Sequence, residues 1–175
     1  MTTATAKKTK DYYRDEYGVQ VALAPQNYVL YGYMKGLGIR SVFEFGCNAG
    51  RHLNQLQRMG MEVDGMDINE RALEAAKVQH NLTLRTGDET ALKDIPSDAY
   101  DAVLTVSVLN HMVDIKETLV QLRRIARKHL VFVETRTRTD ADRYWWKHDY
   151  PGKGVYGYRA KQVKAFYQIW HDTKS

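Results

Sequence analysis

The sequence predicts an α/β fold with a parallel sheet of about five strands and helices on both faces of the sheet. Short apolar, β-prone segments alternate with helical patterns between residues 41 and 135, and this alternation is typical of parallel sheets. One segment, AYDAVLTVSVL at 99–109, is almost continuously apolar, as expected of a strand covered on both faces. The chain has 175 residues, of which 43% are hydrophobic, so we expect one domain with a single core.

The segment before the first strand is predicted to be helical. Residues 1–10 are rich in Thr, Lys and Ala and cannot bury apolar surface, so we expect a disordered tail there and a single domain over 11–175. Residues 12–37 carry apolar side chains at a spacing of three and end in glycines, which predicts helix. We interpret residues 11–38 as an N-terminal helical lid.

Strands and helices then alternate along the chain. The β-prone segments predict strands at 41–45, 61–66, 82–87, 99–109 and 129–135. Apolar periodicity and strong helix formers predict helices near 53–59, at 70–80, at 115–125 and at 160–170. No strand pair is predicted after the fifth strand.

Composition restricts the environment and the kind of site. The chain has no run of about 18 apolar residues, and its N-terminus lacks the apolar stretch of a signal peptide, so we expect a cytoplasmic protein without membrane contact. Cys47 is the single cysteine, which excludes an intramolecular disulfide. The histidines at 52, 80, 129 and 171 match no metal-ligand spacing, so no metal site is predicted.

The segment VFEFGCNAGRHL, at 42–53, is typical of a strand that enters a ligand-binding turn and then a helix. In an open parallel sheet, ligands bind beyond the carboxyl ends of the strands. Gly46 and Gly50 allow close approach of a ligand to the backbone and close packing of helix and strand. Glu44 would repel a pyrophosphate but would favour a ligand with an amino group and a sulfonium cation. Glycines that only form a tight turn are the alternative interpretation.

Two further strand ends carry acids. Asp67 ends the second strand, where a carboxylate can accept hydrogen bonds from ribose hydroxyls; an acid at a helix N-terminus is the alternative. Asp88 ends the third strand, where it could accept a hydrogen bond from an adenine amino group. Glu89 could make this contact instead, with Asp88 capping the turn that follows.

Four segments, VFEFGCNAG, GMDIN, TGDE and AYDAVLTVSVLNHM, occur in this order and resemble the successive motifs of class I S-adenosylmethionine-dependent methyltransferases. The resemblance covers roughly residues 38–135 and implies a Rossmann-like fold with S-adenosyl-L-methionine as the cofactor. The chain departs from the family's glycine pattern at Asn48. A looser resemblance connects it with small methylases of bacterial surface-sugar pathways.

The resemblance also implies cofactor contacts. It places the methionine moiety over 46–50, the ribose on Asp67, the adenine near Ile68 and Asp88, and Ser107 beside the cofactor. The implied cofactor-binding residues are Glu44, Gly46, Cys47, Asn48, Gly50, Asp67, Ile68, Asp88, Glu89 and Ser107.

The family's sheet usually ends in an antiparallel strand pair, which this sequence is predicted to lack. The edge would then stay short, be covered by the aromatic segment that follows the fifth strand, or be completed by another subunit. Because an uncovered edge invites pairing with a second chain, we include a homodimer among the expected assemblies.

The chemistry is expected where the fourth strand ends. Methyl transfer from a sulfonium is an in-line displacement, so the protein mainly aligns an acceptor atom with the methyl group. His111 is the candidate general base, since an imidazole takes a proton near neutral pH, and Asn110 is a candidate acceptor contact. The alternative is catalysis by proximity alone, with His111 packed against its turn.

Two aromatic segments are candidate acceptor-binding regions. Tyr12, Tyr13 and Tyr17 belong to the predicted lid. Residues 137–159 form an aromatic and basic segment in which a second group of side chains could bind a sugar, a phosphate or a nucleobase: Arg143, Trp145, Trp146 and His148. Packing of the rings against the sheet is the alternative for both segments.

The function predicted by these features is methyl transfer to a small-molecule acceptor oxygen or nitrogen, including a sugar or an anionic metabolite. The net charge of +5 and the basic stretches at 7–10, 123–128 and 136–147 keep RNA or DNA as the weaker alternative acceptor. A non-catalytic cofactor-binding protein, and an enzyme that uses the same cofactor without methyl transfer, are further alternatives.

Overall fold

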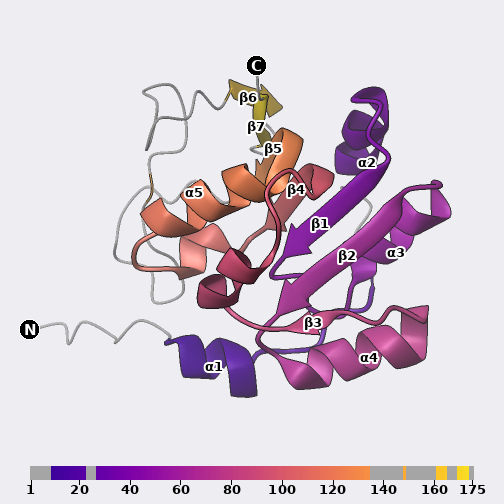
Figure 1. Cartoon of the computed structure of the whole chain (residues 1–175). Coiled ribbons are helices and arrows are strands. Elements are labelled where there is room, and N and C mark those ends of the chain that lie inside the picture. Colours follow the sequence, from indigo (N-terminus) through magenta and orange to yellow (C-terminus); the bar gives the residue numbers. More distant parts are fainter. Residues whose placement is uncertain (1–8, 23–26, 135–147, 149–160, 165–168, 174–175) are drawn as a thin grey trace, which may run out of the picture.

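The computed structural model of the chain describes residues 9–22, 27–134, 148, 161–164 and 169–173. Its centre is a seven-stranded sheet in the order β3-β2-β1-β4-β5-β7-β6 (Figure 1). The strands are β1 (Ser41–Phe45), β2 (Glu62–Asp67), β3 (Arg85–Thr86), β4 (Tyr100–Val106), β5 (Ala126–Val133), β6 (Lys161–Lys164) and β7 (Ile169–Thr173). The first five strands pair in parallel, which confirms the predicted parallel sheet.

Helices cover both faces of this sheet. They are α1 (Lys10–Asp15), α2 (Asn27–Gly36), α3 (Arg51–Arg58), α4 (Glu70–His80) and α5 (Lys116–Ile125), with 3₁₀ turns η1 (Glu89–Asp94) and η2 (Leu109–His111). Figure 1 shows α5 on one face and α3 and α4 on the other. Successive side chains of β1 point to opposite faces: Phe43 joins the buried cluster that contains Leu122 of α5, whereas Val42 joins the cluster that contains Met34 of α2.

The predicted end of the sheet is wrong. Instead of a helix at 160–170, the chain forms β6 and β7, and β7 pairs antiparallel with β5 from His129↔Thr173 to Val133↔Ile169. The physical reason is that β5 is a buried strand whose outer row of backbone groups needs partners. That partnership joins residues about 40 positions apart, so no local pattern reveals it. The uncovered edge that suggested a homodimer is occupied by this strand pair.

The N-terminal region also differs from the expected continuous helix. α1 ends at Asp15, where Glu16 N and Tyr17 N both donate to Tyr12 O, and a separate helix begins at Asn27. Lys10, which was expected in the disordered tail, is the first residue of α1. The third strand is also shorter than predicted.

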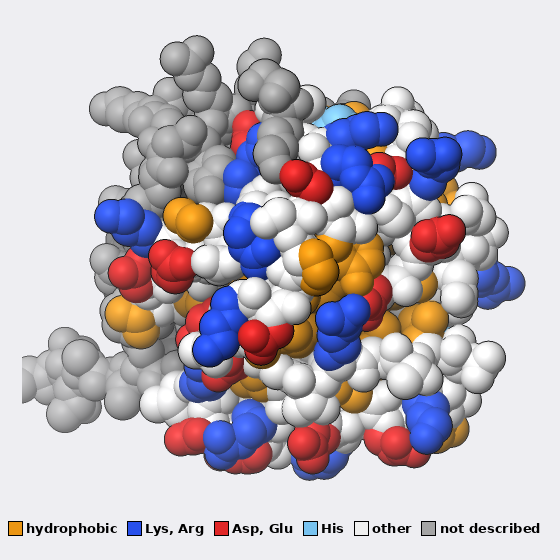
Figure 2. Space-filling model, viewed as in Figure 1, with side chains coloured by type: hydrophobic (Ala, Val, Ile, Leu, Met, Phe, Trp, Pro, Cys, Tyr) orange, Lys and Arg blue, Asp and Glu red, His pale blue; other side chains and the backbone are white. Residues whose placement is uncertain are grey.

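The basic stretch at 123–128 takes part in the fold. Arg123 Nε lies 2.7 Å from Asp172 Oδ2 and so joins α5 to β7. Arg127 Nη1 lies 2.8 Å from Asp101 Oδ1, and Arg124 Nη2 donates to Leu92 O at 2.9 Å. On the face shown in Figure 2, Lys and Arg side chains are interspersed with Asp and Glu. Positive charge therefore does not gather into one patch on that face.

Two sequence-based expectations concern absences. No helix within the described ranges has the length and apolar character needed to cross a bilayer. Likewise, the described residues contain no group of three or more His, Cys, Asp or Glu side chains suited to a metal ion.

We predict that acid weakens the packing of β7 through His171. Tyr33 Oη lies 2.6 Å from His171 Nδ1, and His171 Nε2 lies 3.0 Å from His129 Nδ1. Burial is the main cause that lowers the pKa of His171 to about 4. Between a pH of about 6.5 and about 4, the unfolded chain therefore binds a proton that the folded chain does not, and stability falls as the pH is lowered through this window.

The measurement is the thermal unfolding midpoint across this pH range for wild type and His171→Gln. The variant should unfold at a lower temperature at neutral pH but show a shallower decline with acid. Equal slopes would contradict the assignment to His171.

Candidate functional site

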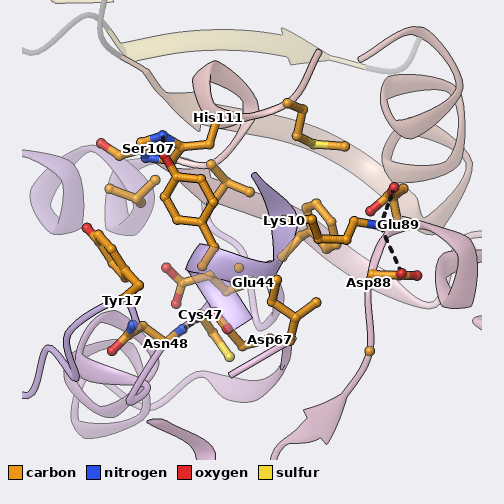
Figure 3. A pocket seen from close by; sticks show the side chains of 18 of the residues that line it. Lys10, Tyr17, Glu44, Cys47, Asn48, Asp67, Asp88, Glu89, Ser107 and His111 are labelled. Atoms are coloured by element: carbon orange, nitrogen blue, oxygen red, sulfur yellow. Dashed lines mark hydrogen bonds and ion pairs between the residues drawn. The ribbon is translucent and has the colours of Figure 1, made fainter. Parts of the chain in front are cut away.

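A cavity of about 440 Å³ lies at the carboxyl ends of β1, β2 and β4. Its wall combines the turn after β1, the ends of β2 and β4, the start of η1 and residues from the N-terminal segment 9–22. Figure 3 shows side chains from these elements pointing toward one another around it. This volume is within the range of pockets that bind small molecules and cofactors.

The turn after β1 is bonded to the end of β2. Gly46 N and Cys47 N both donate to Met66 O, at 2.8 and 3.1 Å. Gly46 has a φ of +74°, and a Cβ there would lie 2.3 Å from Cγ2 of Val108. The need for glycine therefore comes from the close packing of Val108 as well as from the left-handed backbone.

Asn48, which departs from the family's glycine pattern, connects three parts of the site. Its φ of 47° is left-handed, a conformation that asparagine tolerates better than most residues. Its backbone N donates to Asp67 Oδ2 at 2.7 Å. Its side-chain oxygen accepts from Gln20 N at 2.7 Å, and its side-chain nitrogen donates to Gly18 O at 3.2 Å. A glycine would keep the turn but lose the last two bonds.

Two carboxylates on the cavity wall have different surroundings. Asp67 accepts from Asn48 N and from Asn69 N, at 2.7 and 2.9 Å; burial raises its pKa, and these backbone amides oppose the rise. Glu44 is buried, and its Oε2 has no hydrogen-bond partner among the described residues. Burial raises the pKa of Glu44 well above its usual value, while nearby Arg51 acts in the opposite direction.

Lys10 bridges the two acids at the end of β3. Its Nζ lies 2.9 Å from Asp88 Oδ2 and 2.7 Å from Glu89 Oε1. Asp88 also caps η1 by accepting from Thr90 N, and its bonds to Thr90 and Lys10 lower its pKa to about 2. The capping interpretation of Asp88 is therefore confirmed. Sequence reasoning missed Lys10, and its place at the start of an amphipathic tyrosine-rich segment is the one signal that could have indicated a role.

The N-terminal segment lies across the cavity. Tyr13 Oη is 2.7 Å from His111 Nδ1, and the two rings are 4.4 Å apart. Asn69 Nδ2 donates to Tyr13 O at 3.4 Å and to Tyr17 O at 3.1 Å. The turn after β1, the start of α4 and η2 therefore all contact the N-terminal segment 9–22.

Comparison with known proteins decides the family. Residues 43–133, just over half of the chain, match the model of the methyltransferase domain. The chain belongs to this family. The expected class I S-adenosylmethionine-dependent methyltransferases are thereby confirmed, and S-adenosyl-L-methionine is the cofactor of that class.

Curated relatives match part of this methyltransferase domain. A ubiquinone biosynthesis O-methyltransferase of Bradyrhizobium diazoefficiens is 33% identical over 82 residues, which cover 45% of this chain and 32% of the relative. An S-adenosyl-L-methionine-dependent Diels-Alderase, iccD, of Talaromyces variabilis is 28% identical over 114 residues, which cover 58% of this chain and 39% of the relative. The chain thus spans well under half the length of either relative.

Solved structures share the fold. Magnesium protoporphyrin IX methyltransferase of Synechocystis PCC 6803, solved with bound SAH, is 18% identical with a TM-score of 0.67, and the match covers 95% of this chain and 98% of that one. A SAM-dependent methyltransferase of Archaeoglobus fulgidus is 23% identical with a TM-score of 0.54, covering 61% of this chain and 49% of that one. The likeness confirms the Rossmann-like fold, and the first match covers nearly the whole of both chains.

The structure brings most of the predicted site residues of the methyltransferase domain together. Those lining the cavity are Glu44, Gly46, Cys47, Asn48, Asp67, Ile68, Asp88, Glu89, Ser107, Tyr13, Tyr17 and His111. Gly50 lies outside the wall, and a Cβ there would lie 2.9 Å from Leu82 Cδ1, in agreement with its expected packing role.

The other predicted contacts do not line the cavity. Asn110 is a fully buried residue of η2, and Tyr12 packs edge-on against Tyr13. His148 lies 2.9 Å, through Nε2, from Met112 O. The remaining three, Arg143, Trp145 and Trp146, lie outside the described residues. Sequence reasoning also missed Lys10, Gln20 and Arg51, which line the cavity; of these, Arg51 lies within the segment 42–53 that marked the turn.

We predict that Asn48→Gly loosens the N-terminal segment without opening the turn. The variant keeps the left-handed backbone but removes the side-chain bonds to Gln20 N and Gly18 O. Hydrogen exchange at Gln20 N should become roughly fivefold faster, as expected for about 1 kcal/mol per lost hydrogen bond.

The matched control is Asn81→Gly. Asn81 also has a left-handed φ of 55°, at the end of α4, so the same substitution has the same backbone effect. If both variants leave exchange at Gln20 N unchanged, Asn48 does not hold the segment.

Proposed function

We propose that this protein binds S-adenosyl-L-methionine in the cavity at the carboxyl ends of β1, β2 and β4 and catalyses methyl transfer to an oxygen or nitrogen of a small molecule. The observation that carries the proposal is the carboxylate of Glu44, which is buried on the cavity wall with one oxygen lacking a partner among the described residues. A buried carboxylate of this kind is strongly destabilising unless a donor or a positive charge approaches it. The amino group and sulfonium of the cofactor satisfy that requirement.

The other groups on the wall fit the same ligand. Asp67 is held by two backbone amides and presents a fixed acceptor for ribose hydroxyls. Ile68 and the Asp88–Glu89 pair lie where an adenine would reach, although Lys10 occupies both acids. The adenine contact is therefore assigned to this group as a whole, with Lys10 included.

Tyr13 and His111 are proposed as the catalytic pair. The bound cofactor supplies an electrophilic methyl group on its sulfonium. In the tautomer in which His111 Nδ1–H donates to Tyr13 Oη, Nε2 is the ring nitrogen that accepts a proton from an acceptor hydroxyl. Tyr13 thus orients the imidazole, and the aromatic rings of Tyr13 and Tyr17 form the wall beside it.

A small acceptor is favoured over a nucleic acid. The arginines of the basic stretch at 123–128 bond to Asp101, Asp172 and Leu92 O, so they are engaged within the fold. The name of the Bradyrhizobium relative, an O-methyltransferase of ubiquinone biosynthesis, supports a hydroxyl-bearing acceptor. Residues 9–22 are proposed as the lid, and 137–159 remain a predicted acceptor segment. The cytoplasmic location also remains a prediction.

We predict that S-adenosylmethionine and S-adenosylhomocysteine both bind, and that Glu44→Gln weakens both. Loss of a hydrogen bond to a charged group costs about 1.5 to 3 kcal/mol, so the dissociation constant should rise roughly tenfold or more in titration calorimetry. Glu62→Gln is the matched control, because Glu62 is exposed at the other end of β2 and should leave binding unchanged. The absence of binding heat for wild type with either compound would reject the cofactor assignment.

We predict that His111→Asn lowers turnover by roughly 100-fold or more while binding of S-adenosylhomocysteine persists, since general-base catalysis contributes on that scale. Turnover is measured with an acceptor that is first identified by incubating metabolite extracts with the wild-type protein and methyl-labelled cofactor. Tyr13→Phe should cause a smaller loss, because it removes only the orienting bond. Unchanged turnover in His111→Asn would show that proximity alone suffices. Conversion of an extract component without label transfer would instead favour cofactor use of the kind named for the Talaromyces relative.

A further inference from the structure

Glu134, directly after β5, is a buried carboxylate outside the cavity wall. It is 1% exposed. Its Oε1 accepts from Thr105 Oγ1 at 3.0 Å and from Val108 N at 3.1 Å, and its Oε2 accepts from Asn110 N at 3.3 Å. The amide of Leu109 also donates to this carboxylate. Glu134 therefore differs from Glu44 in that both of its oxygens have partners.

These donors are consecutive backbone amides of the turn that follows β4. Ser107 N donates to Val133 O at 2.8 Å, and the next three amides donate to the carboxylate of Glu134. The first amides of a helical turn have no partner within the turn itself, and η2 begins at Leu109. Two adjacent residues at the end of β5 thus bind four consecutive N–H groups, 107–110.

The same turn carries His111. Its backbone N donates to Val108 O at 3.0 Å, and its ring meets Tyr13 Oη at 2.7 Å. Ser107 holds a φ of 55°, a left-handed conformation that costs energy for a residue with a Cβ and persists only when its surroundings enforce it. The bonds to the end of β5 supply that enforcement. Where the turn lies decides where the imidazole of His111 lies.

We propose that Glu134 is the positioning residue for His111: its carboxylate binds the backbone amides of 108–110 and so fixes the orientation of the ring toward Tyr13 and the cavity. This role rests on the proposed function, because it matters for catalysis only if His111 acts on the acceptor. Glu134 touches neither the cavity nor the ring. It acts entirely through the backbone of the turn.

The ionisation of Glu134 gives the arrangement a measurable signature. Burial raises the pKa of Glu134 to about 7, against the opposing effect of its hydrogen bonds to the turn and to Thr105. Among the described residues, the groups that bond to it are the Thr105 hydroxyl from β4 and the three amides from the turn, all uncharged; His111 is a titratable side chain on the same turn. Protonation converts one acceptor oxygen into a hydroxyl, so the amides of 108–110 should respond to it.

The first test uses the wild-type protein, so it does not depend on a variant that folds. By NMR, the side-chain carboxyl carbon of Glu134 should titrate, and the amide signals of Val108, Leu109 and Asn110 should shift with the same midpoint. Independent midpoints, or amides that do not move, would overturn the proposal.

The second test compares Glu134→Gln with Thr105→Val. A glutamine offers one acceptor oxygen and an NH₂ group that must face a backbone N–H whichever way it is turned. Thr105→Val removes only the hydroxyl donor and leaves the carboxylate bonded to the turn. In Glu134→Gln, the ring nitrogen signals of His111 should lose the Tyr13-bonded signature and match those of Tyr13→Phe, whereas in Thr105→Val they should stay as in wild type.

Binding of S-adenosylhomocysteine distinguishes a failure of the positioning role of Glu134 from a failure of the proposed function. If wild type binds it and Glu134→Gln binds it equally well but keeps the wild-type His111 signals, the positioning role is refuted while the proposed function stands. If the melting temperature falls equally in both variants and neither changes the ring signals, Glu134 serves stability alone, which also refutes the proposal. If neither the wild type nor any variant binds S-adenosylhomocysteine, the proposed function fails, whatever the NMR signals show.

Discussion

The bonds between the end of β1 and the end of β2 hold together the parts on which the rest of the site depends. Gly46 N and Cys47 N share the carbonyl of Met66, and Asn48 N binds Asp67. The carboxyl ends of parallel strands lie at a common edge of the sheet. These three bonds fix the turn after β1 at that edge, where it forms part of the cavity wall. They place Glu44 at the base of the cavity and Asp67 beside it. They also leave the side chain of Asn48 pointing to the N-terminal segment. The turn after β1 therefore both forms part of the cavity wall and binds residues 9–22.

Two buried carboxylates, Glu44 and Glu134, and the half-buried Asp67 show how the location and the hydrogen-bonding partners of an acid decide its role. Glu44 keeps an oxygen without a partner among the described residues, Asp67 is fixed by two amides, and Glu134 has both oxygens engaged. Burial raises the pKa of all three, because each charge has lost some or all of its contact with water. Glu44 and Asp67 line the cavity, where an acid can bind a ligand, whereas Glu134 lies outside the wall and its carboxylate binds the backbone of a turn. In the proposed function, the acids at the ends of β1 and β2 thus bind the cofactor, whereas the acid after β5 positions the turn that carries His111.

The segments at both ends of the described chain complete the domain through long-range contacts. β7 covers the edge of β5, and Arg123 joins it to α5. Residues 9–22 reach the cavity through Lys10, Tyr13 and Gln20, which bond to residues 79, 98 and 28 positions away, respectively. Such contacts have no signature in local periodicity. This explains why the C-terminal strands were predicted as helix, and why Lys10 was predicted as part of a disordered tail.

The sequence by itself determined the parallel core, the order of its elements, the family and nearly all of the predicted cofactor contacts that line the cavity, because hydrophobic periodicity and turn residues are local properties. The place of His111 on the cavity wall was also predicted, since it lies shortly after the apolar segment at 99–109. Only the tertiary structure decided which acids are free to bind, that Asn48 links the turn to the N-terminal segment, and that Glu134 holds the turn of His111. These three features depend on which donors and acceptors bond to each side chain. The bonding partners come from residues that are distant in the sequence. Asn110 illustrates the limit: its position after β4 predicted a contact, but the turn directs it into the core.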